Sequence, residues 1–173
     1  MVLDQPAVAD RAARHLVDRG HGQLACLVPG GELAGIAQKR FDAVRAVADA
    51  AGVPVERVDC QPAVDSVRAV TDHWRDPGNR PSAVYAYNDE FALSLIQVLR
   101  DAGLDVPGDI SVIGSGNHPL GATLRPRLTS TFHDMSELGT TVASTVRRLL
   151  DGQEAQAAQG PAVRPRLTIR ESA

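Results

Sequence analysis

The chain has 173 residues, 43% of them hydrophobic and 23% charged, which is typical of one folded domain with its own core. Its formal net charge is −3 and its 18 Lys and Arg residues are scattered. This distribution argues against direct binding of nucleic acid by this chain, because contacts with a phosphate backbone need a clustered basic surface. No apolar run approaches the ~20 residues that span a bilayer. Charged residues throughout the first twenty positions predict that the chain carries no secretory leader.

The first half of the chain alternates helical and strand-like segments. Apolar residues at helical spacing predict helices over 7–18 and 36–51, each followed by a glycine that ends it. Short apolar runs between turns predict strands over 23–28 and 55–59. The apolar face of the second helix is assigned from the helical spacing of Ile36, Arg40, Val44 and Val47.

Two cysteines, Cys26 and Cys60, lie in or beside these predicted strands. No Cys-x-x-Cys or Cys/His spacing suggests a metal site, so we expect two buried free thiols. Such thiols are typical of the reducing cytoplasm.

The second half continues the alternation. Its predicted elements are, in order, a helix over 64–74, a loop over 76–81, a strand over 83–87, a helix over 90–102, strands over 110–113 and 128–132, a helix over 137–150, and a final, more exposed strand over 166–170. Gly114 and Gly116 are assigned to the loop after the 110–113 strand, and the stretch 152–161 to a mobile connection. Strands that alternate with helices predict an α/β fold, with a parallel sheet covered by helices on both faces.

Motifs of catalysis and of nucleotide binding are absent or incomplete. The glycine-rich stretches 29–35 and 114–116 lack both the P-loop Lys-Ser/Thr and the G-x-G-x-x-G spacing. Ser115, His133 and Asp134 form no plausible triad, since adjacent strand residues point in opposite directions. The five histidines show no metal-ligand spacing. We therefore expect that the protein is not an enzyme and that it binds neither a metal nor a cofactor.

Ligands of open α/β sheets bind beyond the carboxyl ends of the strands. That rule selects the loops at 29–35, 60–62, 87–90, 114–118 and 132–134. Asn88 follows the 83–87 strand directly, and its side chain can both donate to and accept from a polar ligand. The alternative is that Asn88 only caps the next helix, a role for which Asp89 is equally suited. Position alone leaves both interpretations open.

The stretch from Ala86-Tyr87-Asn88-Asp89 to Asp109-Ile110-Ser111-Val112-Ile113-Gly114 joins an apolar strand, an Asn-Asp pair, an Ala-Leu helix and a second strand that ends in glycine. This pattern resembles the lactose/galactose-repressor (LacI/GalR) family of bacterial regulators. Residues 15–21, 125–130 and 169–172 resemble further family segments in the same order. Together the matches span nearly the whole chain.

The resemblance implies a homodimeric repressor, with an N-terminal helix-turn-helix on operator DNA and a two-lobed domain similar to periplasmic sugar-binding proteins. On this basis the chain begins inside the second domain and lacks the DNA-binding part. We expect residues 1–133 to form the C-terminal lobe, 134–152 a crossover helix that belongs with the absent N-terminal lobe, and 153–173 a connection and final strand back in the C-terminal lobe. The stripe of Leu138, Val142, Val146 and Leu149 on that helix would then favour dimers of the chain.

The resemblance also suggests five effector-binding residues. Arg40 lies where the family places a ligand-gripping arginine, and Asn88 matches an effector-binding asparagine. Gly116 stands where many sugar-responsive members have an aspartate, Gln61 lies near a common aromatic position, and His133 replaces a frequent glutamine. Loss of the acid and the aromatic favours a smaller or anionic effector over a sugar.

The alternative for Arg40 is a surface arginine paired with Asp42 or Glu32. For the whole chain, the main expectation is a cytoplasmic sensor of a small-molecule effector that controls operator DNA and has no membrane partner. The alternative is a periplasmic-type solute-binding protein, which would require a leader sequence; an enzyme ranks third.

Overall fold

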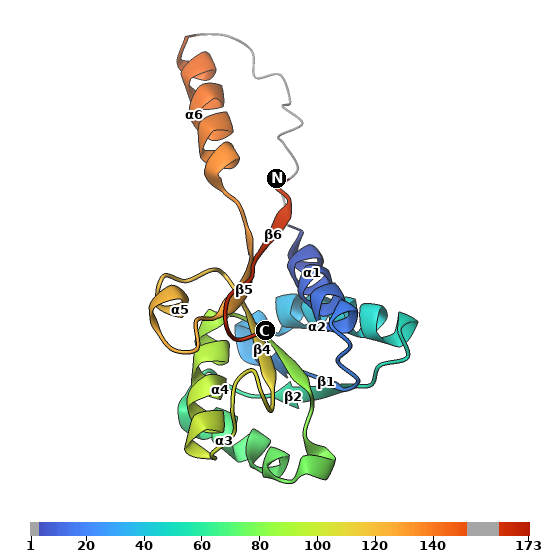
Figure 1. Ribbon diagram of the computed structural model, residues 1–173. Helices are drawn as coiled ribbons and strands as arrows, with labels where there is room; N and C mark the ends of the chain where they lie inside the picture. Colours follow the sequence, from blue (N-terminus) through green and yellow to red (C-terminus); the bar gives the residue numbers. More distant parts are fainter. Residues whose placement is uncertain (1–3, 152–162) are drawn as a thin grey trace.

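The computed structural model describes residues 4–151 and 163–173, apart from the side chains of Glu137, Leu138 and Thr141. Its strands form a single six-stranded sheet of order β2-β1-β3-β4-β5-β6 (Figure 1). They are β1 (Leu24–Val28), β2 (Val55–Asp59), β3 (Ala83–Ala86), β4 (Ser111–Ser115), β5 (Thr129–His133) and β6 (Pro165–Thr168). The first five strands pair in parallel, and β6 pairs antiparallel to β5. The predicted α/β sheet is confirmed, with one antiparallel edge strand added.

Helices cover both faces of the sheet, as predicted (Figure 1). The helices α1 (Gln5–Asp18) and α2 (Ala34–Ala50) pack together on one face, and α3 (Val64–Thr71) and α4 (Asp89–Asp101) pack on the other. Between these elements lie the short turns η1 (Gly31–Leu33), η2 (Asp72–Arg75), η3 (Pro77–Asn79) and α5 (Leu120–Thr123). Asp4 caps α1, because its side chain accepts a hydrogen bond from the Ala7 N–H at 3.2 Å.

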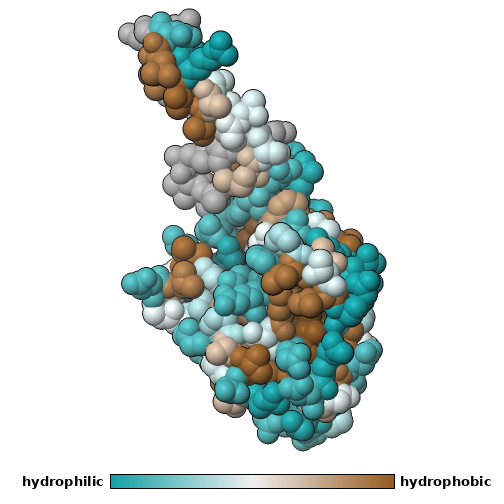
Figure 2. Space-filling model, turned by 90° about the vertical axis from the view of Figure 1, so that its left-hand side faces the viewer, coloured by the Kyte–Doolittle hydropathy of each residue, from teal (hydrophilic) through white to brown (hydrophobic). Residues whose placement is uncertain are grey.

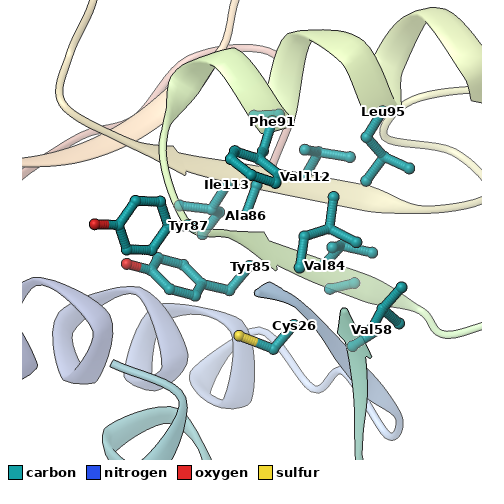
Figure 3. Packing of buried hydrophobic residues seen from close by; sticks show 14 of the residues in the cluster. Cys26, Val58, Val84, Tyr85, Ala86, Tyr87, Phe91, Leu95, Val112 and Ile113 are labelled. Atoms are coloured by element: carbon teal, nitrogen blue, oxygen red, sulfur yellow. The ribbon is translucent and has the colours of Figure 1, made fainter. Parts of the chain in front are cut away.

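The core lies on both sides of the central strands, which are buried along their whole length. Phe91 and Leu95 of α4 lie on the same side of the sheet as Val84, while Tyr85 and Cys26 point to the opposite side (Figure 3). This alternation follows from the two-residue period of a strand. The scarcity of aromatic residues leaves Val, Leu, Ile and Ala to fill most of this space.

Both cysteines are free and buried, as predicted. Burial raises the pKa of the Cys26 thiol to about 12 and that of the Cys60 thiol to about 11. Both side chains therefore stay protonated at neutral pH and act as small apolar groups in the core.

Several predicted boundaries and faces need correction. Ile36 is 37% exposed, whereas Ala37 and Phe41 of the same helix are buried, so the inward face of α2 is rotated from the predicted stripe. Gly114 belongs to β4 rather than to the loop after it. The predicted helix 64–74 ends early and continues as η2, which carries the buried Trp74. The short helix α5 was not predicted.

The helix α6 (Ser136–Leu150) stands away from the sheet, beyond the ends of β5 and β6 (Figure 1). Its apolar residues Val142, Val146 and Leu149 are 52%, 49% and 51% exposed, and Figure 2 shows an apolar stripe along this helix at the top of the view. Of the predictions made for this region, the Leu138 side chain and the connection 152–161 lie outside the described residues. Within the described ranges, none of the helices combines the length and apolarity that crossing a membrane demands.

Candidate functional site

A cavity of about 650 Å³ opens beyond the carboxyl ends of β3 and β4. It lies between the start of α4 and the loop that joins β4 to α5, and this volume falls within the usual range of small-molecule sites. Its lining residues are Asn88, Asp89, Glu90, Leu93, Ser115, Gly116, Asn117, His118, Pro119 and Leu120. The cavity therefore lies at two of the strand-end loops that the sequence selects, 87–90 and 114–118.

Asn88 joins β3 to α4 and has an extended backbone with φ −146° and ψ 179°. Its Oδ1 atom accepts a hydrogen bond from the Phe91 N–H at 3.1 Å, so the helix cap is real. Among the described hydrogen bonds of this side chain, only Oδ1 takes part, and the side chain also lines the cavity. The cap and the ligand-binding interpretation are thus compatible, since the amide nitrogen can still donate.

Arg40 reaches the same edge of the sheet from α2. Its Nη1 atom donates to the Tyr87 carbonyl oxygen at 2.6 Å and lies 3.5 Å from Ser115 Oγ, while Nη2 donates to Gln5 Oε1 at 2.5 Å. The guanidinium carbon lies 4.7 Å from the centroid of the Tyr87 ring. The surface-pair alternative is therefore wrong.

Through these contacts Arg40 links α2 to the end of β3 and to α1. It does not line the cavity itself, but its neighbour Ser115 does. The Nε atom of Arg40 is buried and has no hydrogen-bond partner among the described residues.

Besides Arg40, two more of the five candidate residues lie outside the lining. His133, at the end of β5, contacts the Asp4 carbonyl oxygen through Nε2 at 3.0 Å. Gln61 is exposed, and its backbone N–H donates to Ser66 Oγ at 2.9 Å. The structure thus brings Asn88 and Gly116 to one cavity, with Arg40 beside it. The effector-binding roles of all five stay predictions.

Pro119 of the lining lies just beyond the selected stretch 114–118. Ser115, at the end of β4, and Asn117 and His118 of the β4–α5 loop lie within that stretch but were not predicted to bind a ligand. Their only signal was this position after a strand, because no motif marks them. Asp89 and Glu90 give the lining two carboxylates, and it includes no Lys or Arg. Across the described ranges, no group of three or more His, Cys, Asp or Glu side chains is placed to hold a metal.

The cavity wall formed by the β4–α5 loop has an unusual backbone. Gly116 has a φ of +129° and Asn117 a φ of +55°, both in the region that side chains disfavour. Asn117 is supported by Arg170, whose Nη2 atom donates to Asn117 Oδ1 at 2.6 Å. Polar residues from the start of α4 and from the β4–α5 loop therefore line a space that suits a small polar molecule.

Known proteins share this architecture. A family model for a periplasmic binding protein-like domain matches residues 13–173. The HTH-type transcriptional regulator DegA of Bacillus subtilis (strain 168) is 30% identical over 175 residues, which cover 99% of this chain and 51% of that protein. The chain spans about half the length, or less, of the curated relatives it matches.

Solved structures agree with this match. A regulatory protein of the LacI family from Chloroflexus aggregans has a TM-score of 0.83 and 26% identity, covering 98% of this chain and 62% of that chain. A LacI family transcriptional regulator from Arthrobacter sp. FB24, in complex with lactose, has a TM-score of 0.78 and 25% identity, covering 98% and 64%. The chain belongs to the periplasmic-binding-protein-like domain family, in the form carried by LacI-family transcriptional regulators.

Proposed function

We propose that this chain is the effector-sensing part of a cytoplasmic LacI-family repressor and binds a small polar metabolite in the cavity between α4 and the β4–α5 loop. The observation that carries the proposal is the cavity itself, at the carboxyl ends of β3 and β4 and lined by Asn88 and Gly116. The lactose complex of the Arthrobacter relative supports a ligand-binding role for the fold.

The cavity favours a neutral effector over an anionic one. Its charged lining residues are Asp89 and Glu90, which repel an anion. Two nearby cations are held by other protein groups. Arg40 donates to the Tyr87 carbonyl oxygen and to Gln5, and Arg170 donates to the Leu128 carbonyl oxygen and to Asn117. Of the smaller or anionic effector expected from the sequence, the anionic alternative therefore loses its main support, and a polyol or another uncharged hydrogen-bonding molecule is the better candidate.

The rest of the regulator lies outside this chain in the proposal. In this proposal, the segment 1–133 and the final strand belong to the C-terminal lobe, and the segment 134–152, which contains α6, belongs with an N-terminal lobe. Effector binding would change the angle between the lobes and so the spacing of two helix-turn-helix heads on operator DNA. The coding sequence upstream of Met1 tests this directly. A helix-turn-helix roughly 100 residues before it is expected, whereas a secretory leader would favour a solute-binding protein.

A thermal-shift screen of the complete regulator tests the effector class. D-ribose, lactose, gluconate and hypoxanthine are suitable probes, since a compound that binds only the native state raises the melting temperature. We expect a concentration-dependent rise with an uncharged compound. The rise should vanish in Asn88→Ser, which keeps an oxygen for the helix cap but removes the amide donor.

Asn79→Ser is the matched control, because Asn79 is exposed on a distant turn. A shift with gluconate alone would overturn the preference for a neutral effector. An unchanged shift in Asn88→Ser would remove Asn88 from the site.

A further inference from the structure

One buried charge at the cavity has no ion-pair partner within the described residues. Asp89 is only 3% exposed, and none of the ion pairs of the described chain includes it. Its Oδ1 atom accepts a hydrogen bond from Ser130 Oγ at 2.6 Å, and its Oδ2 atom accepts one from the His118 N–H at 2.5 Å. A buried carboxylate is unfavourable unless such bonds, or a helix N-terminus like that of α4, compensate it.

Ser130 extends this arrangement into the cavity wall. Its Oγ atom also accepts a hydrogen bond from the Asn117 N–H at 2.9 Å. Next to it on β5, the Thr131 carbonyl oxygen accepts one from the Gly116 N–H at 2.7 Å. Three consecutive backbone N–H groups of the cavity wall, at 116, 117 and 118, are therefore held by Asp89 and β5.

The sheet leaves room for the carboxylate at one position. A Cβ atom added at Gly114 would lie 2.3 Å from Asp89 Oδ1 and 3.2 Å from Asp89 Cα. The backbone at 114 is an ordinary strand, so its glycine is explained by this close approach and not by conformation. Gly114, at the end of the Ile110–Gly114 segment, therefore lies against Asp89 of the Asn-Asp pair.

We propose that Asp89 is a positioning residue for the effector cavity. Together with Ser130 it forms a clasp that fixes the wall 116–118 against β5. The ligand-facing side chains of that wall are then held in place before any ligand arrives, which lowers the ordering cost of binding. This inference rests on the proposed function for its purpose, but the clasp itself can be tested without a ligand.

Amide hydrogen exchange, followed by NMR on the 173-residue chain, tests the clasp. We expect Ser130→Ala to speed exchange at Asn117 and His118 roughly tenfold, as loss of about one hydrogen bond predicts. Thr131→Val is the matched control. Its hydroxyl is buried on the same strand, but donates to the Gly114 carbonyl oxygen and contacts none of the three wall amides.

Asp89→Asn gives a second measurement. It keeps the size of the side chain but leaves one acceptor oxygen for two partners. The His118 amide proton should move upfield, because its hydrogen bond to a charged oxygen is lost or weakened. Wild-type exchange at 117 and 118 in both variants would overturn the proposal.

Equal acceleration at Leu27, a buried residue of β1, would also overturn it, because that result indicates general destabilisation. Failure of the ligand screen with a positive exchange result would leave the clasp standing and refute only the proposed effector function. The two failures are therefore distinguishable.

Discussion

Asn88 shows how one side chain can serve folding and binding together. Its Oδ1 atom caps α4, and the residue also lines the cavity. We expect Asn88→Ala to lower the free energy of unfolding by about 1 kcal/mol, the usual effect of losing a cap. Asn88→Ser should retain most of the stability, since serine also caps well. Urea unfolding measures both, and equal losses would show that the cap contributes little.

Gly114 tests the close approach of α4 to β4. We expect Gly114→Ala to lower the free energy of unfolding by about 1–3 kcal/mol, because the added methyl group overlaps Asp89. Gly35→Ala is the control, since an added Cβ meets no atom within 4 Å on that exposed turn of α2. Thermal and urea unfolding give the comparison. A fully stable Gly114→Ala protein would mean that the carboxylate moves easily.

At the scale of elements, the chain end completes the sheet. Ser172 is fully buried, and its Oγ atom donates to the Val112 carbonyl oxygen at 2.6 Å and accepts from the Thr129 N–H at 2.9 Å. Its own carbonyl oxygen accepts from the Val112 N–H at 2.7 Å. The last residues therefore connect β4 to β5 near the starts of both strands.

Ser172→Ala should lower the free energy of unfolding by about 1–3 kcal/mol, because it leaves buried backbone groups without their partner. The exposed Ser136, whose hydroxyl donates to Asp134, provides the matched control. Its replacement by alanine should change stability by less than about 0.5 kcal/mol. Equal effects in urea unfolding would contradict the structural role of the chain end.

In the molecule as a whole, α6 has an apolar face that the described part of the chain leaves largely uncovered. Val142, Val146 and Leu149 are about half exposed on a helix that projects from the body (Figure 2). An apolar stripe of this kind favours association. We expect the 173-residue chain to sediment as a dimer at micromolar concentration.

The double variant Val146→Glu/Leu149→Glu should be a monomer, whereas Thr140→Glu, on another face of α6, should remain dimeric. Sedimentation velocity measures all three proteins. A monomeric parent chain would refute the expectation, and dimerisation of the double variant would place the contact elsewhere.

Local sequence pattern was enough to predict the types of the elements and the loops that line the cavity. Hydrophobic periodicity is a local property, so it predicted each long helix and strand to within a few residues. The carboxyl-end rule then selected 87–90 and 114–118, because every parallel strand of a sheet points the same way. The family resemblance, carried by Asn88, Asp89 and the segment ending at Gly114, needed no coordinates either.

Which side chains contact one another depends on the packing of the whole chain. Arg40 and Ser115 are 75 residues apart in sequence, and Asp89 and Ser130 are 41 apart. Their contacts depend on strand order and on the rotation of α2, which also turned Ile36 outward against its pattern. Local pattern cannot fix those quantities, because they result from packing all the helices against one sheet. For the same reason the sequence did not predict that Arg40 contacts the Tyr87 carbonyl oxygen, that His133 and Gln61 lie outside the cavity, or that Asp89 is buried.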